Sequence, residues 1–226
     1  MNNNYKWNGT SFNSMGIIIE KTPIPNKPKH SYNQYTIPGR SGYLAIDNKT
    51  FEPLFLSLEC HFDTNNVADI NELRAWLDGY GTLQLDDEKE YTGYISNSIS
   101  FDKITHFRKF LIQFTLQPLA KATTATTINA LSLATISVDT YGYAYPKITI
   151  TGTGDISLTL NGTQFTIYDA DGTYVLDCEA KIITKNGINQ SSNMSGNFPE
   201  LKNGNNSLVK SGTITALTIE YYKTFI

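Results

Sequence analysis

The sequence has little charge, little cysteine and no long apolar run, and each shortage argues against a class of protein. Charged residues make up 17% of the 226 residues, the net charge is −3, and no basic patch is present that would bind nucleic acid through its phosphates. The best apolar stretch, Gly16–Ile19, is strand-sized and far below the roughly 20 residues that span a bilayer. The first residues, Met1–Tyr5, lack the basic and apolar segments of a signal peptide. We therefore expect no specific nucleic-acid binding, no membrane insertion, and assembly in a cytoplasm.

The two cysteines, Cys60 and Cys178, lie far apart in the sequence. Their spacing matches neither a disulfide framework nor a thiolate metal site. Both occupy the apolar side of a strand-like alternation, so we interpret them as buried small hydrophobic residues.

The chain is rich in tyrosine, threonine and asparagine, which favour strands and turns. Apolar residues occupy every second position of Leu54–Phe62 and of Phe110–Leu116, as in half-buried antiparallel strands. Between them, Val67–Leu77 has apolar residues at helical spacing, and Asn66 or Asp69 can cap its start. This segment is the one substantial helix that we predict, with its Trp76 packed onto a sheet.

An Ala/Thr tract, Pro118–Thr127, separates two parts of different character. It predicts a boundary or crossover at 121–130, between a domain at 1–120 and a domain at 131–226. In the second domain, Asn161–Gly162 and Asp171–Gly172 are hairpin signals. Its last strand, Thr213–Tyr221, switches its apolar parity, which suggests a bulge. About seven or eight short strands in this half indicate a β-sandwich.

The order of several motifs resembles the distal tail protein (Dit) family of siphophages over nearly the whole chain. In the first half the matching segments are Trp7–Phe12 with Met15–Ile19, Tyr35–Gly42 (the family's "IPGRsG" turn), Leu73–Leu83 and Phe110–Leu116. In the second half they are Gly152–Leu158, Asn161–Gly162 and Asn197–Asn206. Each motif alone is also ordinary turn chemistry, so their order and spacing carry the resemblance.

The resemblance implies a mainly β fold, with an N-terminal β-sandwich-like belt domain that contains one α-helix and a C-terminal galectin-like β-sandwich. It also implies a structural homo-hexamer, a ring that joins the tail tube to the distal tip. The expected partners are the tail tube protein, a tail-associated tip protein, and receptor-binding or baseplate proteins. The expected location is the virion tail tip, after assembly in the host cytoplasm.

A closed ring requires a heterologous interface, in which one patch meets a different patch on the next subunit. Such an assembly uses strand edges and apolar side chains that a monomer would need to protect. We expect the ring interface among these residues of the N-terminal strands: Arg40, Tyr43, Leu44, Ile46, Tyr91, Tyr94 and Ile95. Ordinary core packing is the alternative for the apolar members, and a plain exposed turn is the alternative for Arg40.

No pattern in the sequence indicates catalysis, a cofactor or a metal. The three histidines, His30, His61 and His106, share no metal-ligand spacing, and Asp169–Gly172 has only the first part of a calcium loop, so a hairpin turn is favoured there. The acidic cluster Asp86–Glu90 follows a strand and is interpreted as a solvated loop. We therefore expect that the protein is not an enzyme.

Carbohydrate binding by the C-terminal sandwich, which would make the protein an adhesion module of a phage or a tail-like bacteriocin, is the alternative function. Sugar sites stack a ring on an exposed aromatic side chain, and Tyr168 and Tyr174 are the available platforms in that half. Protein docking through the polar loop Asn186–Asn193 is the competing use of this domain.

Overall fold

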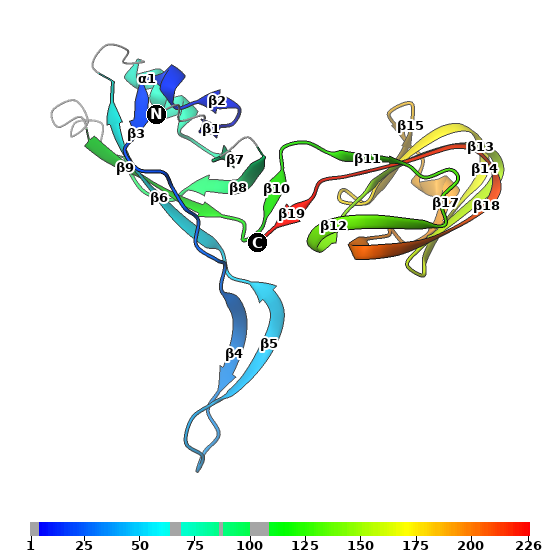
Figure 1. The fold of residues 1–226 in the computed structure, drawn as a ribbon, viewed down its shortest axis with the longest axis horizontal. Coiled ribbons are helices and arrows are strands. Elements are labelled where there is room, and N and C mark those ends of the chain that lie inside the picture. Colours follow the sequence, from blue (N-terminus) through cyan, green and yellow to red (C-terminus); the bar gives the residue numbers. More distant parts are fainter. Residues whose placement is uncertain (1–4, 64–68, 86–87, 100–108) are drawn as a thin grey trace. The chain divides into compact units, whose positions relative to one another are not determined.

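The computed structural model describes residues 5–63, 69–85, 88–99 and 109–226 (Figure 1). The chain divides into an N-terminal unit, Met1–Ala120, and a C-terminal unit, Lys121–Phe225. Both units are built from antiparallel strands, which confirms the mainly β fold class predicted from the sequence. Among the described residues, no helix is long and apolar enough to cross a membrane.

The N-terminal unit is built on one antiparallel sheet and a short α-helix. The strands are β1 (Lys6–Trp7), β2 (Thr10–Ser11), β3 (Ile17–Ile19), β6 (Leu54–Phe62), β7 (Tyr80–Gln84), β8 (Lys89–Ile95) and β9 (Lys109–Leu116), in the spatial order β2-β1-β7-β8-β9-β6-β3. A 3₁₀ turn (Asn13–Met15) precedes β3. The helix, α1, runs from Ile70 to Trp76, and the Asp69 side chain accepts a hydrogen bond from the Asn71 amide at 2.7 Å. The predicted helix and its cap at Asp69 are thus confirmed, whereas Asn66 and Val67 lie outside the described residues.

The core of the N-terminal unit lies between α1 and the inner face of the sheet. Leu54, Leu56, Leu58, Cys60 and Phe62 are all buried, and the residues between them are more exposed. Two tryptophans 69 positions apart then bind each other's backbone: Trp7 Nε1 donates to the Trp76 carbonyl, and Trp76 Nε1 donates to the Trp7 carbonyl, both at 3.1 Å. These reciprocal bonds fasten the end of α1 to β1 while the Trp7 ring packs at 5.2 Å from Phe114.

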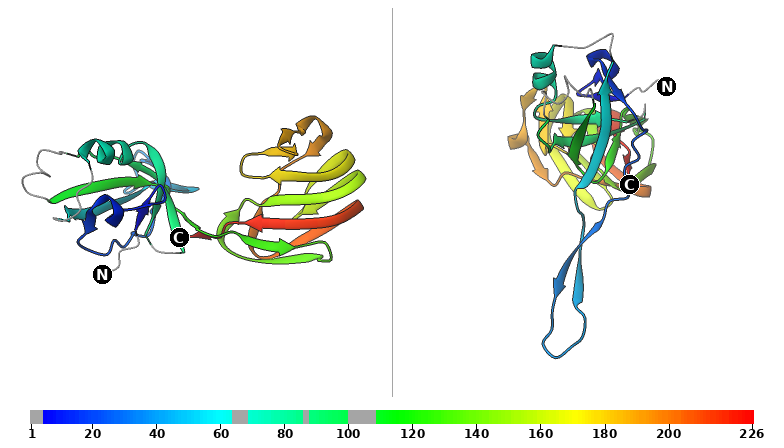
Figure 2. Two further views of the ribbon diagram at one scale, coloured as in Figure 1. Left: turned by 90° about the horizontal axis from the view of Figure 1, so that it is seen from above. Right: turned by 90° about the vertical axis from the view of Figure 1, so that its left-hand side faces the viewer.

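A separate two-stranded sheet is inserted between β3 and β6 of the N-terminal unit, and we call it the arm. It consists of β4 (His30–Tyr35) and β5 (Leu44–Phe51) and projects from the main sheet (Figures 1 and 2). Only Glu52 and Pro53 separate β5 from β6, so one nearly continuous strand passes from the arm into the sheet.

The C-terminal unit contains long, strongly curved strands, which are coloured green to red in Figure 2. The long strands are β12 (Thr135–Ala144), β13 (Lys147–Leu160), β14 (Thr163–Asp177) and β18 (Leu201–Tyr221). The short strands are β11 (Thr126–Asn129), β15 (Ile182–Lys185), β16 (Ile188–Asn189), β17 (Met194–Gly196) and β19 (Thr224–Phe225). The short strand β10 (Ala120–Ala122) spans the boundary between the units. The main path is β11-β18-β13-β14-β15-β16, with β12 paired to β18 and β17 paired to β14.

Three details of the C-terminal unit test the sequence interpretation directly. Asn161–Gly162 forms the predicted hairpin, because Leu160 pairs with Thr163 across it. The predicted bulge is present in β18 at Thr215, because Thr151 pairs with Ala216 and Gly152 pairs with Ile214. The strand starts earlier than predicted, at Leu201. Asp171–Gly172 was wrongly predicted to be a hairpin: both residues pair with β13 inside the continuous strand β14.

The C-terminal core contains one fully buried polar residue, Asn206. Its Oδ1 accepts from the Lys202 amide at 2.8 Å and from Asn161 Nδ2 at 2.6 Å. Its Nδ2 donates to the Lys202 and Gly204 carbonyls, both at 2.9 Å. The side chain therefore provides hydrogen-bond partners for the backbone of Lys202 and Gly204 in β18, and it connects this part of the strand to Asn161 in the β13–β14 turn.

Replacing Asn206 by alanine should lower the free energy of unfolding of the C-terminal unit by about 3 kcal/mol, because several buried backbone groups lose their partner. The matched control, Asn205→Ala, removes an exposed amide from the same strand and should change the free energy by less than about 0.5 kcal/mol. Calorimetry of the full chain measures both variants. Both tryptophans belong to the N-terminal unit, so their fluorescence identifies the transition that should not move. Equal effects of the two substitutions would contradict the role given to Asn206.

Candidate assembly surfaces

The tip of the arm is a turn set by its sequence. The Arg40 amide donates to the Ile37 carbonyl at 3.1 Å, and Gly39 has φ +79°. A type II turn requires positive φ at its third position and often has proline at its second, and Pro38–Gly39 fits both positions. The turn presents Arg40 to solvent, and among the described residues this guanidinium has no ion-pair partner.

One face of the arm is apolar and uncovered. Tyr35 pairs with Leu44 and Asn33 pairs with Ile46, so these side chains share a face. Tyr35, Leu44 and Ile46 are 52%, 45% and 49% exposed. We call these three residues, together with Arg40 and Tyr43 at the tip, the arm surface. All residues from Tyr32 to Asp47 are exposed, so the arm has no core of its own beyond the ring contacts of His30 with Tyr32 and Phe51 at its base.

The outer face of the N-terminal sheet carries a second set of exposed aromatic side chains. Tyr80 pairs with Tyr94, Tyr94 with Thr115, and Thr115 with Phe55, so the four residues form a line across β7, β8, β9 and β6. Tyr80, Tyr94 and Phe55 are 62%, 47% and 69% exposed, and we call these three the aromatic row. The opposite face of the same strands holds the core, so the row is an outward surface.

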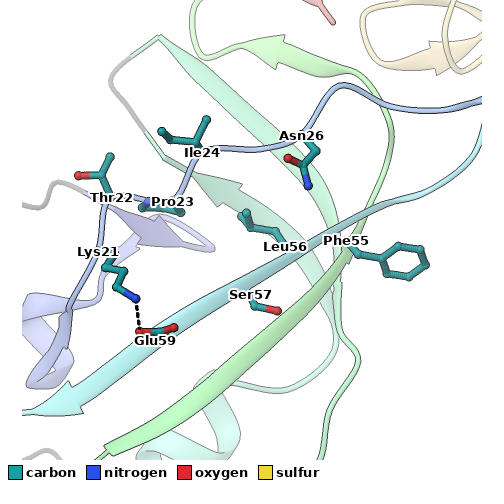
Figure 3. Close-up of a pocket in the computed structure, with 9 residues that line it drawn as sticks. All are labelled: Lys21, Thr22, Pro23, Ile24, Asn26, Phe55, Leu56, Ser57 and Glu59. Carbon is teal, nitrogen blue, oxygen red and sulfur yellow. Dashed lines mark ion pairs between the residues drawn. The ribbon is translucent and has the colours of Figure 1, made fainter.

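Beside the aromatic row, an open groove of about 370 Å³ lies over the outer face of β6 (Figure 3). The extended segment Lys21–Asn26 forms one side, and Phe55, Ser57 and Glu59 form the other. Lys21 Nζ pairs with Glu59 Oε2 at 3.0 Å, while Ile24 is 81% exposed. The groove thus has apolar side chains beside a solvated ion pair, a combination suited to contact with another protein.

A second ion cluster lies on the same outer face, around Glu20. Lys109 Nζ is 2.8 Å from Glu20 Oε1, and His61 Nδ1 is 3.3 Å from the same oxygen but without the geometry of a hydrogen bond. The hydrogen bond from Lys109 lowers the pKa of the Glu20 carboxyl, and the same bond raises the pKa of the Lys109 ammonium.

The structure separates the seven residues predicted for the ring interface into three groups. Arg40, Tyr43, Leu44 and Ile46 lie on the arm surface, and Tyr94 lies in the aromatic row. Tyr91 and Ile95 point to the opposite side of β8 and pack against the N-terminal core, so the core-packing alternative applies to these two.

The residues predicted for the ring interface did not include Tyr35, Tyr80 or Phe55, which the structure leaves exposed. Phe55 did carry a signal, because it is an aromatic residue at an otherwise polar parity of β6. The exposure of Tyr80 depends on its pairing with Tyr94, which local sequence does not specify.

The groups considered for catalysis or ligand binding are dispersed or engaged. Among the described residues, no three metal-ligating side chains come together, and His106, Asp86 and Asp87 lie outside those residues. Asp171 accepts hydrogen bonds from Lys185 and from the Tyr174 hydroxyl. Tyr174 is only 2% exposed, so it is not the sugar platform considered from the sequence, whereas Tyr168 is 46% exposed.

Comparison with known proteins gives a match in structure alone. No family model matches the sequence, and no curated protein matches it. The crystal structure of SPP1 Dit (gp 19.1) superposes with a TM-score of 0.78 at 13% identity, covering 99% of each chain. A chain of the phage P2 baseplate in its activated conformation with calcium superposes with a TM-score of only 0.48 at 7% identity. The superposition covers 94% of this chain and 92% of that chain, and it is too weak to indicate a shared fold. The chain therefore shares the fold of SPP1 Dit over its whole length.

Both cysteines should be inert toward thiol reagents in the native protein. Burial raises the pKa of Cys60 and of Cys178 to about 12, so almost no reactive thiolate is present at neutral pH. Absorbance after addition of an aromatic disulfide reagent should show no labelling of the native chain and two thiols per chain in denaturant. Rapid labelling of the native chain would contradict the burial of these side chains.

The Glu20–Lys109 pair should stabilise the N-terminal unit only above the acid range. A carboxyl whose folded pKa is lowered adds stability above its unfolded pKa, and the contribution disappears as pH falls through the folded pKa. Lys109→Met should therefore be less stable than wild type at neutral pH and equal to it in acid. Tryptophan fluorescence during urea unfolding measures this difference, with the exposed Lys27→Met as control. A difference that persists unchanged in acid would contradict the pairing.

Proposed function

We propose that this chain is a structural subunit of the hub at the distal end of a long-tailed phage tail. The observation that carries the proposal is the fold shared with SPP1 Dit over 99% of both chains. That protein is described as a paradigm of the hub adsorption apparatus in phages that infect Gram-positive bacteria. In this proposal the protein is a virion component of the tail tip, is assembled in the host cytoplasm, and has no catalytic role.

In the proposed assembly, six copies close into a ring through the N-terminal unit. A closed ring joins two different patches of neighbouring subunits, and the N-terminal unit has two such patches on separate strands. The arm surface carries Tyr35, Leu44 and Ile46, and the outer sheet face carries the aromatic row and the groove. Packing the arm of one subunit against the outer face of the next would cover both, and would bring Arg40 toward acidic side chains such as Glu59.

The ring would connect the tail tube protein on one side with a tail-associated tip protein on the other. The C-terminal unit would then present its surface to receptor-binding or baseplate proteins. The segment Asn186–Asn193, which was predicted as a loop and contains β16, supports a docking role, because it is mostly polar and largely exposed.

The structure removes one of the two side chains on which the carbohydrate-binding alternative was based. Of the two tyrosines considered as platforms, Tyr174 is buried and hydrogen-bonded to Asp171, which leaves Tyr168 alone. We therefore retain the structural role as the proposed function.

Substitutions on the arm surface test the proposed ring without disturbing the fold. Ile46→Asp puts a charge where a neighbouring subunit should pack and should weaken association by about 2 kcal/mol or more per contact. Arg40→Ala should loosen the ring in the same direction if its guanidinium bridges subunits. Because both side chains are exposed within the chain, the unfolding free energy should change by less than about 0.5 kcal/mol. Native mass spectrometry measures the oligomer, and urea unfolding measures the chain.

Ala45→Asp is the matched control, since Ala45 is exposed, adjacent in β5, and on the opposite face of the arm. It should leave the oligomer intact. Loss of assembly in Ala45→Asp but not in Ile46→Asp would reject the assigned face of the arm, and a wild-type chain that remains monomeric would reject the ring.

A further inference from the structure

Four asparagine–glycine pairs occur in the chain: Asn8–Gly9, Asn161–Gly162, Asn186–Gly187 and Asn203–Gly204. In such a pair the backbone nitrogen of glycine can attack the asparagine side-chain carbon, because glycine has no side chain to obstruct the approach. The attack requires a free side chain and a backbone that can leave its turn conformation. The structure provides these conditions to different degrees at the four pairs.

Three of the pairs occupy two-residue hairpin turns with positive φ at both positions. The φ angles are 50° and 78° at Asn8–Gly9, 51° and 83° at Asn161–Gly162, and 52° and 78° at Asn186–Gly187. Turn type therefore does not distinguish these three pairs, so any difference in reactivity must come from what holds each turn.

The side chains of three asparagines are held by hydrogen bonds. Asn8 Oδ1 accepts from the Thr82 amide at 2.9 Å, and Asn203 Oδ1 accepts from the Thr140 amide at 3.4 Å. Asn161 is held at both ends, since its Oδ1 accepts from the Ser207 amide at 3.1 Å and its Nδ2 donates to the Glu200 carbonyl at 3.2 Å. Asn186 is exposed, and within the described part of the chain its side chain has no hydrogen-bond partner.

The strands that flank the turns differ as well. Asn161–Gly162 closes the β13–β14 ladder, which extends from Leu160↔Thr163 to Lys147↔Asp177. Asn186–Gly187 closes a short ladder, in which the pairs Lys185↔Ile188 and Thr184↔Asn189 are followed by one hydrogen bond from the Gln190 amide to the Ile183 carbonyl at 2.9 Å, and β16 is the last strand of its sheet. Short terminal ladders open at low free energy, so the turn at Asn186 reaches other backbone conformations far more often.

We propose that Asn186 is a site of spontaneous deamidation in the folded protein. The Gly187 nitrogen bonds to Cγ of Asn186 and loses its proton, the Cγ–Nδ2 bond breaks, and ammonia leaves. Water then opens the cyclic imide at either carbonyl and yields aspartate or isoaspartate. No oxidant, enzyme or cofactor is required.

The product changes the surface of the C-terminal unit. Both outcomes add one negative charge beside Lys185, and isoaspartate also places an extra methylene in the backbone of a two-residue turn. The longer backbone no longer fits the Lys185↔Ile188 pairing, which weakens the attachment of β16 to β15. This site is independent of the proposed ring, because none of its residues belongs to the arm surface or the aromatic row.

Incubation of the purified full chain at mildly alkaline pH, followed by digestion and electron-transfer fragmentation, measures conversion at each pair. Asn186 should convert at least about tenfold faster than Asn161, which shares its turn type and following residue. In the urea-unfolded chain, the four pairs should convert at similar rates, which shows that the selectivity comes from the fold. Equal rates at Asn186 and Asn161 in the folded chain would overturn the proposal, as would no conversion at Asn186.

Asn186→Gln provides an independent check, because a glutamine side chain closes the corresponding ring much more slowly. Isoelectric focusing of aged wild type should show an early acidic species, and this species should be absent from aged Asn186→Gln. Its persistence in the variant would assign the charge change to another residue and overturn the proposal.

Discussion

In strand β6 every second side chain is buried, and this alternation determines which face of the N-terminal sheet packs on the core and which face is exposed. Its inner residues, from Leu54 to Phe62, form the floor on which Trp7 and α1 pack. Its outer residues include Phe55, whose ring stays in solvent at the end of the aromatic row. The same strand runs on through Glu52–Pro53 into β5, where the side chains of residues 44–47 are exposed. One alternating strand therefore supplies both the core and the surfaces left open for a partner.

The arm differs from the C-terminal unit because it lacks a buried core. The C-terminal unit buries a continuous core along β13, β14 and β18, and the hydrogen bonds of Asn206 complete its one buried amide. The arm, by contrast, is a two-stranded ribbon, which is at most marginally stable alone in water. Its exposed Tyr35, Leu44 and Ile46 would gain burial only against another surface. The proposed packing of the arm against a neighbouring subunit would supply that surface.

Local patterns in the sequence identified the features that depend on neighbouring residues. The alternation of Leu54–Phe62, the Asp69 cap and the Asn161–Gly162 turn each follow from a few adjacent positions. Features that depend on pairing between distant strands could not be predicted from the sequence. Whether Tyr91 or Tyr94 faces outward depends on the register with β9, and Asp171–Gly172 lies inside a strand because β13 pairs straight through it. The mutual hydrogen bonds of Trp7 and Trp76 join positions that no local signal connects.

Electron microscopy of the purified protein tests most directly the proposal that the chain assembles into a ring, because the arm of one copy should bind the outer sheet face of the next. The account predicts class averages of a closed six-fold ring with an open centre. Particles of single chains, or of a twofold dimer without a central opening, would contradict it.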